Sequence, residues 1–116
     1  FHSGFPWTQE VAALAHNYAN ALPSMTWMPT ICTSAAIRAL DDFIDASPSC
    51  NSITWGSDCW AAEERIGALL AWRHVAAKVL AGRTADGRLS RSGAEILARK
   101  LMRGNVSGVY GLAAEA

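Results

Sequence analysis

The sequence predicts an α/β fold, in which three parallel strand–helix units are followed by C-terminal helices. Segments with strand-like patterns alternate with segments of helical periodicity, which is typical of a parallel sheet with helices on its faces. The strand-like segments are short and alternate poorly between polar and apolar residues, as expected where both faces of a sheet are covered. Hydrophobic residues make up 51% of the 116 residues and charged residues 17%, which favours a compact chain over a disordered one.

The predicted domain organisation is a single partial domain over residues 1–116. A sheet of only three parallel strands leaves its edges and one apolar face uncovered, so we expect the chain to be part of a longer protein. Its first residue, Phe1 rather than Met, agrees with that expectation. The strand–helix units are expected at about 1–20, 25–46 and 52–82, and the C-terminal helices at 90–112.

The first two units each place a helix after a short strand. In the first unit, Gly-Phe-Pro at 4–6 is typical of a strand end, and Thr8 can cap the helix that follows. The second strand covers 25–31, where Pro29 ends regular pairing, and its helix runs to about Ala46. At helical spacing, one face of the first helix comprises Val11, Leu14, Ala15 and Tyr18, and the inward stripe of the second comprises Ile37, Leu40 and Ile44.

The third unit and the C-terminal helices complete the prediction. A strand at 52–58 precedes a long helix from about 61 to 81. Ser92 and Glu95 have the spacing of a capping box at the start of the next helix, and Asn105 can cap a last short turn. The packed face of the long helix is expected to comprise Ile66, Leu69, Leu70, Val75 and Val79.

Two potential metal ligands stand at predicted strand ends. Asp58 closes the third strand, and His2 lies at the end of the first. Because the loops at the carboxyl ends of parallel strands share one face of a sheet, these two side chains can converge on one metal ion. On these residues alone the alternatives stay open. An aspartate at a strand end commonly caps the next helix, and a single histidine near a terminus commonly has no role.

Four segments carry a resemblance to a known family. They read HSGFP at 2–6, ITWGSD at 53–58, ADGRLS at 85–90 and MRGNVSGVYGL at 102–112. This arrangement resembles the C-terminal end of amidohydrolase-superfamily enzymes, in particular the metal-dependent hydrolases related to uronate isomerases. In that family the sixth strand ends with a histidine followed by glycine and proline, and the last strand ends in Gly-Ser-Asp or Gly-Thr-Asp. The resemblance covers nearly the whole chain.

The resemblance implies a fold and a chemistry. The chain would supply strands six to eight of a (β/α)8 TIM barrel, which needs ~250 residues when whole. Asp58 would bind a divalent metal ion, zinc, and accept a proton from the attacking water, and His2 would be a second ligand or contact the substrate. Because a bound ion lowers the pKa of water toward ~7, the activated water would hydrolyse a small carbonyl substrate.

The further metal ligands of that family are missing from the sequence. It contains no His-x-His pair, and the other histidines, His16 and His74, lie in helical patterns. Since three protein ligands are the usual minimum for a catalytic zinc, we expect a part of a hydrolase that is inactive as an isolated chain. Trp7 and Trp60 follow strand ends and are candidates for the substrate pocket. The other tryptophans are expected to pack between strands and helices: Trp27, Trp55 and Trp72.

The zero net charge hides a division along the chain. Residues 1–64 hold one cation and seven acidic residues, whereas residues 65–116 hold nine cations and three acidic residues. We expect the basic half to be solvated or paired with the acidic half. A nucleic-acid binder that uses the basic face is the last alternative, because no aromatic residues interleave with the cations. The expected partners therefore include no nucleic acid, and no membrane either, since no apolar run approaches the ~20 residues of a span.

Cysteine usage bears on the compartment. Cys32, Cys50 and Cys59 match no disulfide framework or zinc-ribbon spacing, which indicates free thiols and a cytoplasmic location. The expected partners are a small-molecule substrate and either a second copy of the chain or the missing part of the barrel. The alternative to the hydrolase is a self-associating structural module with a decayed site.

Overall fold

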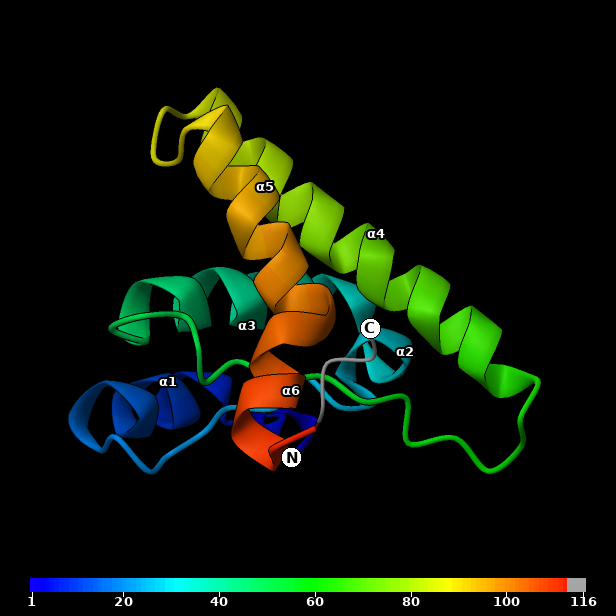
Figure 1. Cartoon of the computed structure of the whole chain (residues 1–116). Helices are drawn as coiled ribbons and strands as arrows, with labels where there is room; N and C mark the ends of the chain where they lie inside the picture. Colours follow the sequence, from blue (N-terminus) through cyan, green and yellow to red (C-terminus); the bar gives the residue numbers. More distant parts are fainter. Residues whose placement is uncertain (113–116) are drawn as a thin grey trace.

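The computed structural model describes residues 1–112, and helices dominate it (Figure 1). Helix α3 packs between α1 and α4, α2 contacts α3 and α4, and α5 runs beside α4. A π-helical turn, η2, joins α5 to α6 without a break. The elements in order are η1 (His2–Gly4), α1 (Thr8–Asn17), α2 (Met28–Ile31), α3 (Thr33–Ala46), α4 (Glu64–Ala85), α5 (Arg91–Arg99), η2 (Lys100–Gly104) and α6 (Asn105–Tyr110).

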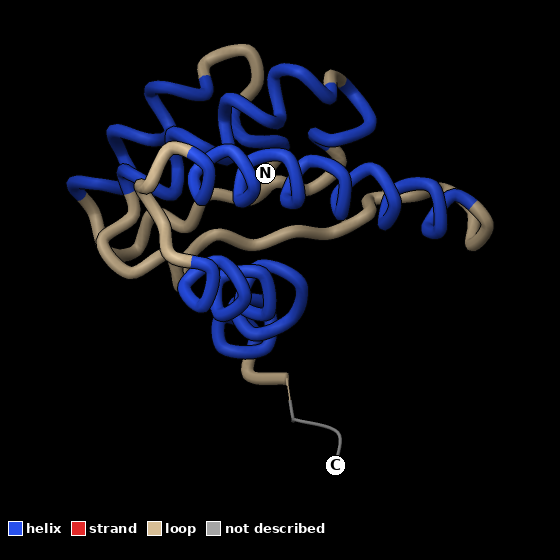
Figure 2. Tube along the Cα trace, turned by 90° about the horizontal axis from the view of Figure 1, so that it is seen from above, coloured by secondary structure: helices blue, strands red, loops and turns tan. Residues whose placement is uncertain are grey.

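The predicted α/β fold is wrong for the part of the chain that the structure describes. Within residues 1–112 no segment forms a strand, and Figure 2 shows helices joined by loops. The expected strand at 25–31 gives way to α2, and the expected strand at 52–58 is irregular. The TIM barrel that the resemblance implied is therefore not supported either, because it requires parallel strands.

In the part of the chain that the structure describes, what remains of parallel pairing is a single bridge between Ser24 and Thr54. The Met25 N–H donates to the Thr54 carbonyl at 2.8 Å, and the Thr54 N–H donates to the Pro23 carbonyl at 3.1 Å. Beside it, the Ser3 N–H donates to the Ser24 carbonyl at 2.8 Å. Three short segments therefore lie side by side through isolated backbone hydrogen bonds and do not form a sheet.

The pairing stops early because the chain turns immediately after it. Trp27 adopts a left-handed backbone with φ of 59° and leads directly into α2. Pro29, near the start of that helix, has no N–H to donate to a neighbouring strand. On the other side, Ser3 also has a positive φ, of 55°, and the short helix η1 forms there instead of a strand.

The core is built by α3 and α4. Helix α3 buries a stripe of small and large apolar residues that faces its neighbours, namely Ala35, Ala36, Ala39, Leu40 and Phe43. In α4, the fully buried Trp72 stacks on Trp55 with 5.8 Å between ring centroids and an interplanar angle of 4°. Val75 and Val79 are buried as expected. The rest of the predicted packed face is wrong, because the first turns of α4 project from the body (Figure 1) and leave exposed Ile66, Leu69 and Leu70.

An arginine on α4 joins the acidic and basic halves of the chain. The Arg83 side chain is 5% exposed, and its Nε donates to Asp41 Oδ1 at 2.6 Å while Nη1 donates to Asp45 Oδ1 at 2.7 Å. A third bond runs from Nη2 to the Asp41 carbonyl. Burial alone lowers the pKa of Arg83, but the hydrogen bonds with Asp45 and Asp41 outweigh burial and raise it. We call Arg83, Asp41 and Asp45 the Arg83 cluster.

Two side chains hold the C-terminal helices in place. Ser90 caps α5 by accepting a hydrogen bond from the Gly93 N–H at 3.1 Å, two residues before the expected cap at Ser92. The buried Asn105 does not act as the expected cap, because its Nδ2 donates to the carbonyls of Cys50 and Ile53 at 2.6 and 2.8 Å. In residues 1–112, no helix combines the length and the apolar character that a membrane crossing requires.

Candidate functional site

His2 and Asp58, which are 56 positions apart in the sequence, meet in the structure. His2 Nε2 lies 2.9 Å from Asp58 Oδ2, and the two side chains are 41% and 53% exposed. The N-terminal segment is held in place by Ser3, which is buried and whose hydroxyl donates to Met25 Sδ at 3.1 Å. The short backbone contacts between the three side-by-side segments therefore bring an imidazole and a carboxylate together at the surface.

The backbone is strained at this site. His2, Trp27 and Asp58 have φ values of 55°, 59° and 52°, in the left-handed region that favours glycine. For other residues this conformation costs roughly 1–2 kcal/mol each. Among non-glycine residues 1–112, only Ser3 and Cys50 share it. Backbone strain of this kind gathers at functional sites more often than elsewhere, which directs attention to this part of the surface.

A cavity of about 430 Å³ opens beside the pair. Trp27, Asp58, Cys59 and Trp60 line it. The Trp27 ring also meets the His2 ring edge-on, with 5.4 Å between centroids and an interplanar angle of 68°. We call this space the Trp27 cavity. It combines two aromatic surfaces with a carboxylate, a thiol and a neighbouring imidazole, so an apolar or carbonyl compound can lie against the rings and reach the polar pair.

The two candidate pocket tryptophans lie in different places. Trp60 is 98% exposed and lines the Trp27 cavity, and its backbone N–H donates to Glu64 Oε2 at 3.1 Å. Trp7 precedes α1 and lines a separate cavity, together with residues of α1 and α3. Asp58 and Trp60 therefore share a cavity, and Trp7 does not belong to it.

The side chains present do not fit a metal centre. Within residues 1–112, no three His, Cys, Asp or Glu side chains gather where they could hold a metal ion. His2 and Asp58 provide two donors, and these donors are directly hydrogen bonded to each other. Because a catalytic zinc usually has three protein ligands, the zinc site expected from the resemblance is not supported by these residues.

Trp27 is the site residue that the sequence reasoning missed. It was expected to be a packing residue, yet its side chain is 45% exposed, lines the cavity and contacts the His2 ring. Its position in the sequence could have revealed it. Trp27 lies at the end of the second extended segment, just as Asp58 lies at the end of the third. Cys59, which was expected to be a free thiol, also lines the cavity.

Comparison with known proteins adds no assignment. Scans of protein-family models, of curated proteins and of solved structures found no match to this chain. The amidohydrolase resemblance therefore remains a prediction from the quoted motifs.

Proposed function

We propose that the His2–Asp58 pair transfers protons during hydrolysis of a small carbonyl substrate held in the Trp27 cavity. The supporting observation is the 2.9 Å contact between His2 Nε2 and Asp58 Oδ2 beside that cavity. A carboxylate bonded to one imidazole nitrogen fixes the tautomer and leaves the other nitrogen free to accept a proton. This is the part of an amidohydrolase-type reaction that these residues can carry out without a metal ion.

The proposed sequence of events uses the two ring nitrogens of His2 differently. Asp58 accepts the N–H of Nε2, so Nδ1 keeps a lone pair. Nδ1 takes a proton from water while the water oxygen bonds to the substrate carbonyl carbon, and Asp58 stabilises the resulting imidazolium. As the tetrahedral intermediate collapses, the bond to the leaving group breaks and the leaving group receives the proton from Nδ1. The products are the carboxylic acid and the protonated leaving group.

Hydrolysis of p-nitrophenyl acetate, an activated carbonyl probe, tests the proposal. General-base catalysis contributes typically ~10²–10⁴-fold, and a site this exposed belongs at the low end. We expect His2→Gln to remove the enhancement and Asp58→Asn to reduce it about tenfold.

The matched control is His74→Gln, which makes the same change at an exposed position of α4. Circular dichroism of each variant verifies that the helices are retained. If folded His2→Gln and His74→Gln chains both hydrolyse the ester at the parent rate, the pair is not catalytic.

A second candidate, self-association, rests on a different observation. Ile66, Leu69 and Leu70 lie on one face of the first turns of α4 and are exposed, and the exposed Trp60 precedes them. The molecule exposes 7081 Å², about 1,000 Å² more than the roughly 6,100 Å² expected for a compact monomer of 12.4 kDa. One partner in a standard interface buries about 800 Å². A second copy of the chain can therefore cover this face.

Sedimentation velocity over a range of concentrations tests this candidate. We expect the parent chain to form a dimer and the double variant Ile66→Glu/Leu70→Glu to be monomeric. Leu14→Glu, an exposed leucine on α1, is the control and should leave the dimer intact. A parent chain that stays monomeric at its highest soluble concentration would rule this candidate out.

A further inference from the structure

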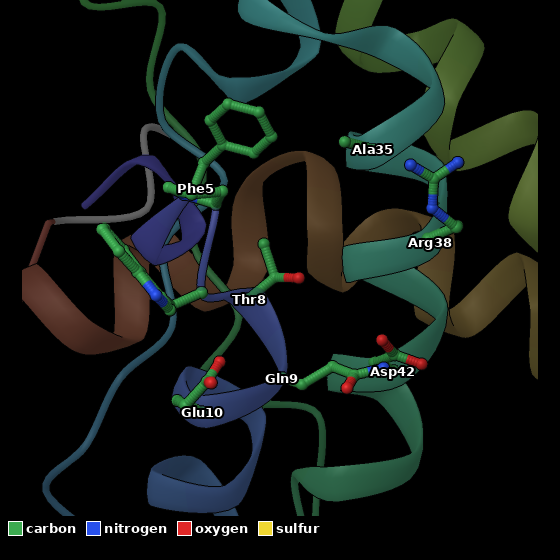
Figure 3. A pocket seen from close by; sticks show the side chains of 9 residues that line it. Phe5, Thr8, Gln9, Glu10, Ala35, Arg38 and Asp42 are labelled. Atoms are coloured by element: carbon green, nitrogen blue, oxygen red, sulfur yellow. The ribbon is translucent and has the colours of Figure 1, made fainter.

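A second cavity, of about 360 Å³, lies between α3 and the N-terminal part of α1. Figure 3 shows Phe5 and Thr8 on one side and Ala35 and Arg38, from α3, on the other. The volume falls within the ~300–1,000 Å³ of small-molecule pockets. No lining residue is shared with the Trp27 cavity, so this is an independent site. We call it the Arg38 cavity.

The Arg38 cavity presents charges of both signs that do not neutralise each other. Arg38 and Asp42 are four residues apart on α3, the spacing at which a helical ion pair commonly forms. Among the hydrogen bonds and ion pairs of the part of the chain that the structure describes, none involves either side chain. By contrast, Asp41 and Asp45 on the same helix are both engaged by Arg83. A guanidinium and a carboxylate are thus left available to a ligand.

The remaining lining supplies an apolar wall and further polar groups. The Phe5 ring and Trp7 are both exposed at the cavity, where they offer aromatic surface. Thr8, Gln9 and Glu10, from the first turn of α1, add a hydroxyl, an amide and a second carboxylate. Figure 3 shows the Gln9 side chain extending toward Asp42. Ala35 has a small side chain opposite the Phe5 ring. An apolar group therefore fits at one end of the cavity and ionic groups at the other.

The electrostatic environment of Asp42 favours a cation beside it. Burial raises the pKa of this carboxyl, and the neighbouring Asp41 and Asp45 raise it further. Each of these effects disfavours the charged form of Asp42. A positively charged group bound at the carboxylate would offset both effects. The charge of Arg38 lowers the pKa of Asp42 only enough to offset part of this rise. Within residues 1–112, the Arg38 guanidinium makes no ion pair with Asp42.

We propose that the Arg38 cavity binds a small zwitterion, an α-amino acid with an apolar side chain. The ligand carboxylate bonds to the Arg38 guanidinium, the ammonium bonds to the Asp42 carboxylate, and the side chain lies against Phe5 and Trp7. Arginine suits the carboxylate end because its planar fork donates two parallel hydrogen bonds. The dual requirement separates this ligand class from simple acids and simple amines.

Binding of L-phenylalanine, measured by NMR titration of the full chain, tests the proposal. Two probes each lack one charge: 3-phenylpropionate has no ammonium, and phenethylamine has no carboxylate. We expect L-phenylalanine to bind at least tenfold more tightly than either probe. We expect Arg38→Gln to weaken the binding of L-phenylalanine at least tenfold. Asp42→Asn should weaken L-phenylalanine binding to a similar extent and leave the binding of 3-phenylpropionate unchanged.

Control variants remove the same charges elsewhere. Arg73→Gln and Glu63→Gln alter exposed residues outside the cavity and should bind as the parent does. The proposal is overturned if L-phenylalanine shows no saturable binding, if both single-charge probes bind as tightly, or if Arg38→Gln and Arg73→Gln bind equally. Arg38→Gln should retain the ester hydrolysis assigned to His2 and Asp58, so the two proposals fail separately.

Discussion

The Arg83 cluster and the His2–Asp58 pair both join a cationic or basic side chain to carboxylates far away in the sequence, yet they differ in almost every other respect. Arg83 is 5% exposed, donates three hydrogen bonds and belongs to a regular helix. His2 and Asp58 are about half exposed, share one contact and sit on left-handed backbone. The first arrangement holds helices together, whereas the second keeps reactive groups accessible at a cost in backbone energy. The residues that stabilise the fold and the residues of the candidate site therefore lie in different places. Substitutions can test how independent the two sets are.

The largest effect is expected from Arg83→Ala. Removing a buried partner and leaving its charges uncompensated typically costs ~3–5 kcal/mol, and the partial exposure of Asp41 and Asp45 places this variant near the low end, about 3 kcal/mol. Urea denaturation measures the change in unfolding free energy. Arg73→Ala, on the exposed side of α4, should change it by less than about 0.5 kcal/mol. Equal losses of unfolding free energy in both variants would show that the Arg83 cluster contributes no more to stability than an exposed arginine does.

A smaller loss is expected from Asn105→Ala, which also belongs to the stabilising side of the comparison. The substitution removes the donor of two hydrogen bonds and leaves the carbonyls of Cys50 and Ile53 without it. Leaving buried acceptors unsatisfied costs ~1–3 kcal/mol, so we expect about 2 kcal/mol. Hydrogen exchange should show that the 50–53 loop loses protection. Unchanged protection there would mean that α6 is anchored by other contacts.

At the candidate site, the pair of variants Asp58→Gly and Asp58→Ala isolates the backbone strain. Both remove the carboxylate, but only alanine retains the steric conflict at φ of 52°. Because left-handed backbone costs a non-glycine residue roughly 1–2 kcal/mol, the glycine variant should be about 1 kcal/mol more stable than the alanine variant. Thermal or urea unfolding of the two chains measures this difference. Equal stability would mean that the left-handed conformation at Asp58 carries no strain.

The smallest effects come from two neighbouring carboxyls of α3 and have opposite signs. A hydrogen bond from Arg83 lowers the pKa of Asp45, so its stabilising contribution is present above the unfolded value near ~3.9 and is lost as the pH falls through the lower folded value. Asp45→Asn should therefore destabilise the chain at pH 7, by about 0.5 kcal/mol since the group is largely exposed.

Burial raises the pKa of Asp42, so its ionisation opposes folding at neutral pH. Asp42→Asn should stabilise the chain slightly at pH 7, and this gain should vanish below the unfolded value near ~3.9, where the carboxyl is protonated in both states. Unfolding free energies of the two variants at pH 7 and pH 3 check both signs. Changes of the same sign at pH 7 would contradict this assignment.

The longer helices could be predicted from local patterns, whereas the strands, and α2 in place of one of them, could not. The helix that begins at Thr8 and the one that ends at Ala46 follow from periodicity within a few positions, but the expected cap at Thr8 is wrong, because Trp7 is the N-cap residue and no side chain caps either helix. A strand depends on a distant partner, and here the left-handed turn at Trp27 and the nearby Pro29 stop the pairing after one bridge. The exposure of Ile66 was likewise missed, because helical spacing shows which residues share a face and not whether another element covers it.

The candidate site was only partly accessible to sequence reasoning. Placing His2 and Asp58 at the ends of the first and third expected strands anticipated that they would approach each other, although no strands form in residues 1–112. The zinc expectation stays a prediction, since residues 1–112 bring together only the two donors that the sequence offered. The Arg38 cavity had no sequence signal, because its two walls come from separate helices and its charges are ordinary surface residues by pattern.

The parallel stack of Trp55 on Trp72 also has a spectroscopic consequence. Two stacked indole rings with centroids 5.8 Å apart and nearly parallel planes couple their electronic transitions, so the folded core should produce an exciton signal in circular dichroism. Trp72 is fully buried, whereas Trp60 is 98% exposed and accessible to a soluble quencher such as acrylamide. The chain thus carries separate optical reporters for its core and for its candidate site. Loss of the dichroic signal would report melting of the core, while a change in quenching alone would report an event at the Trp27 cavity.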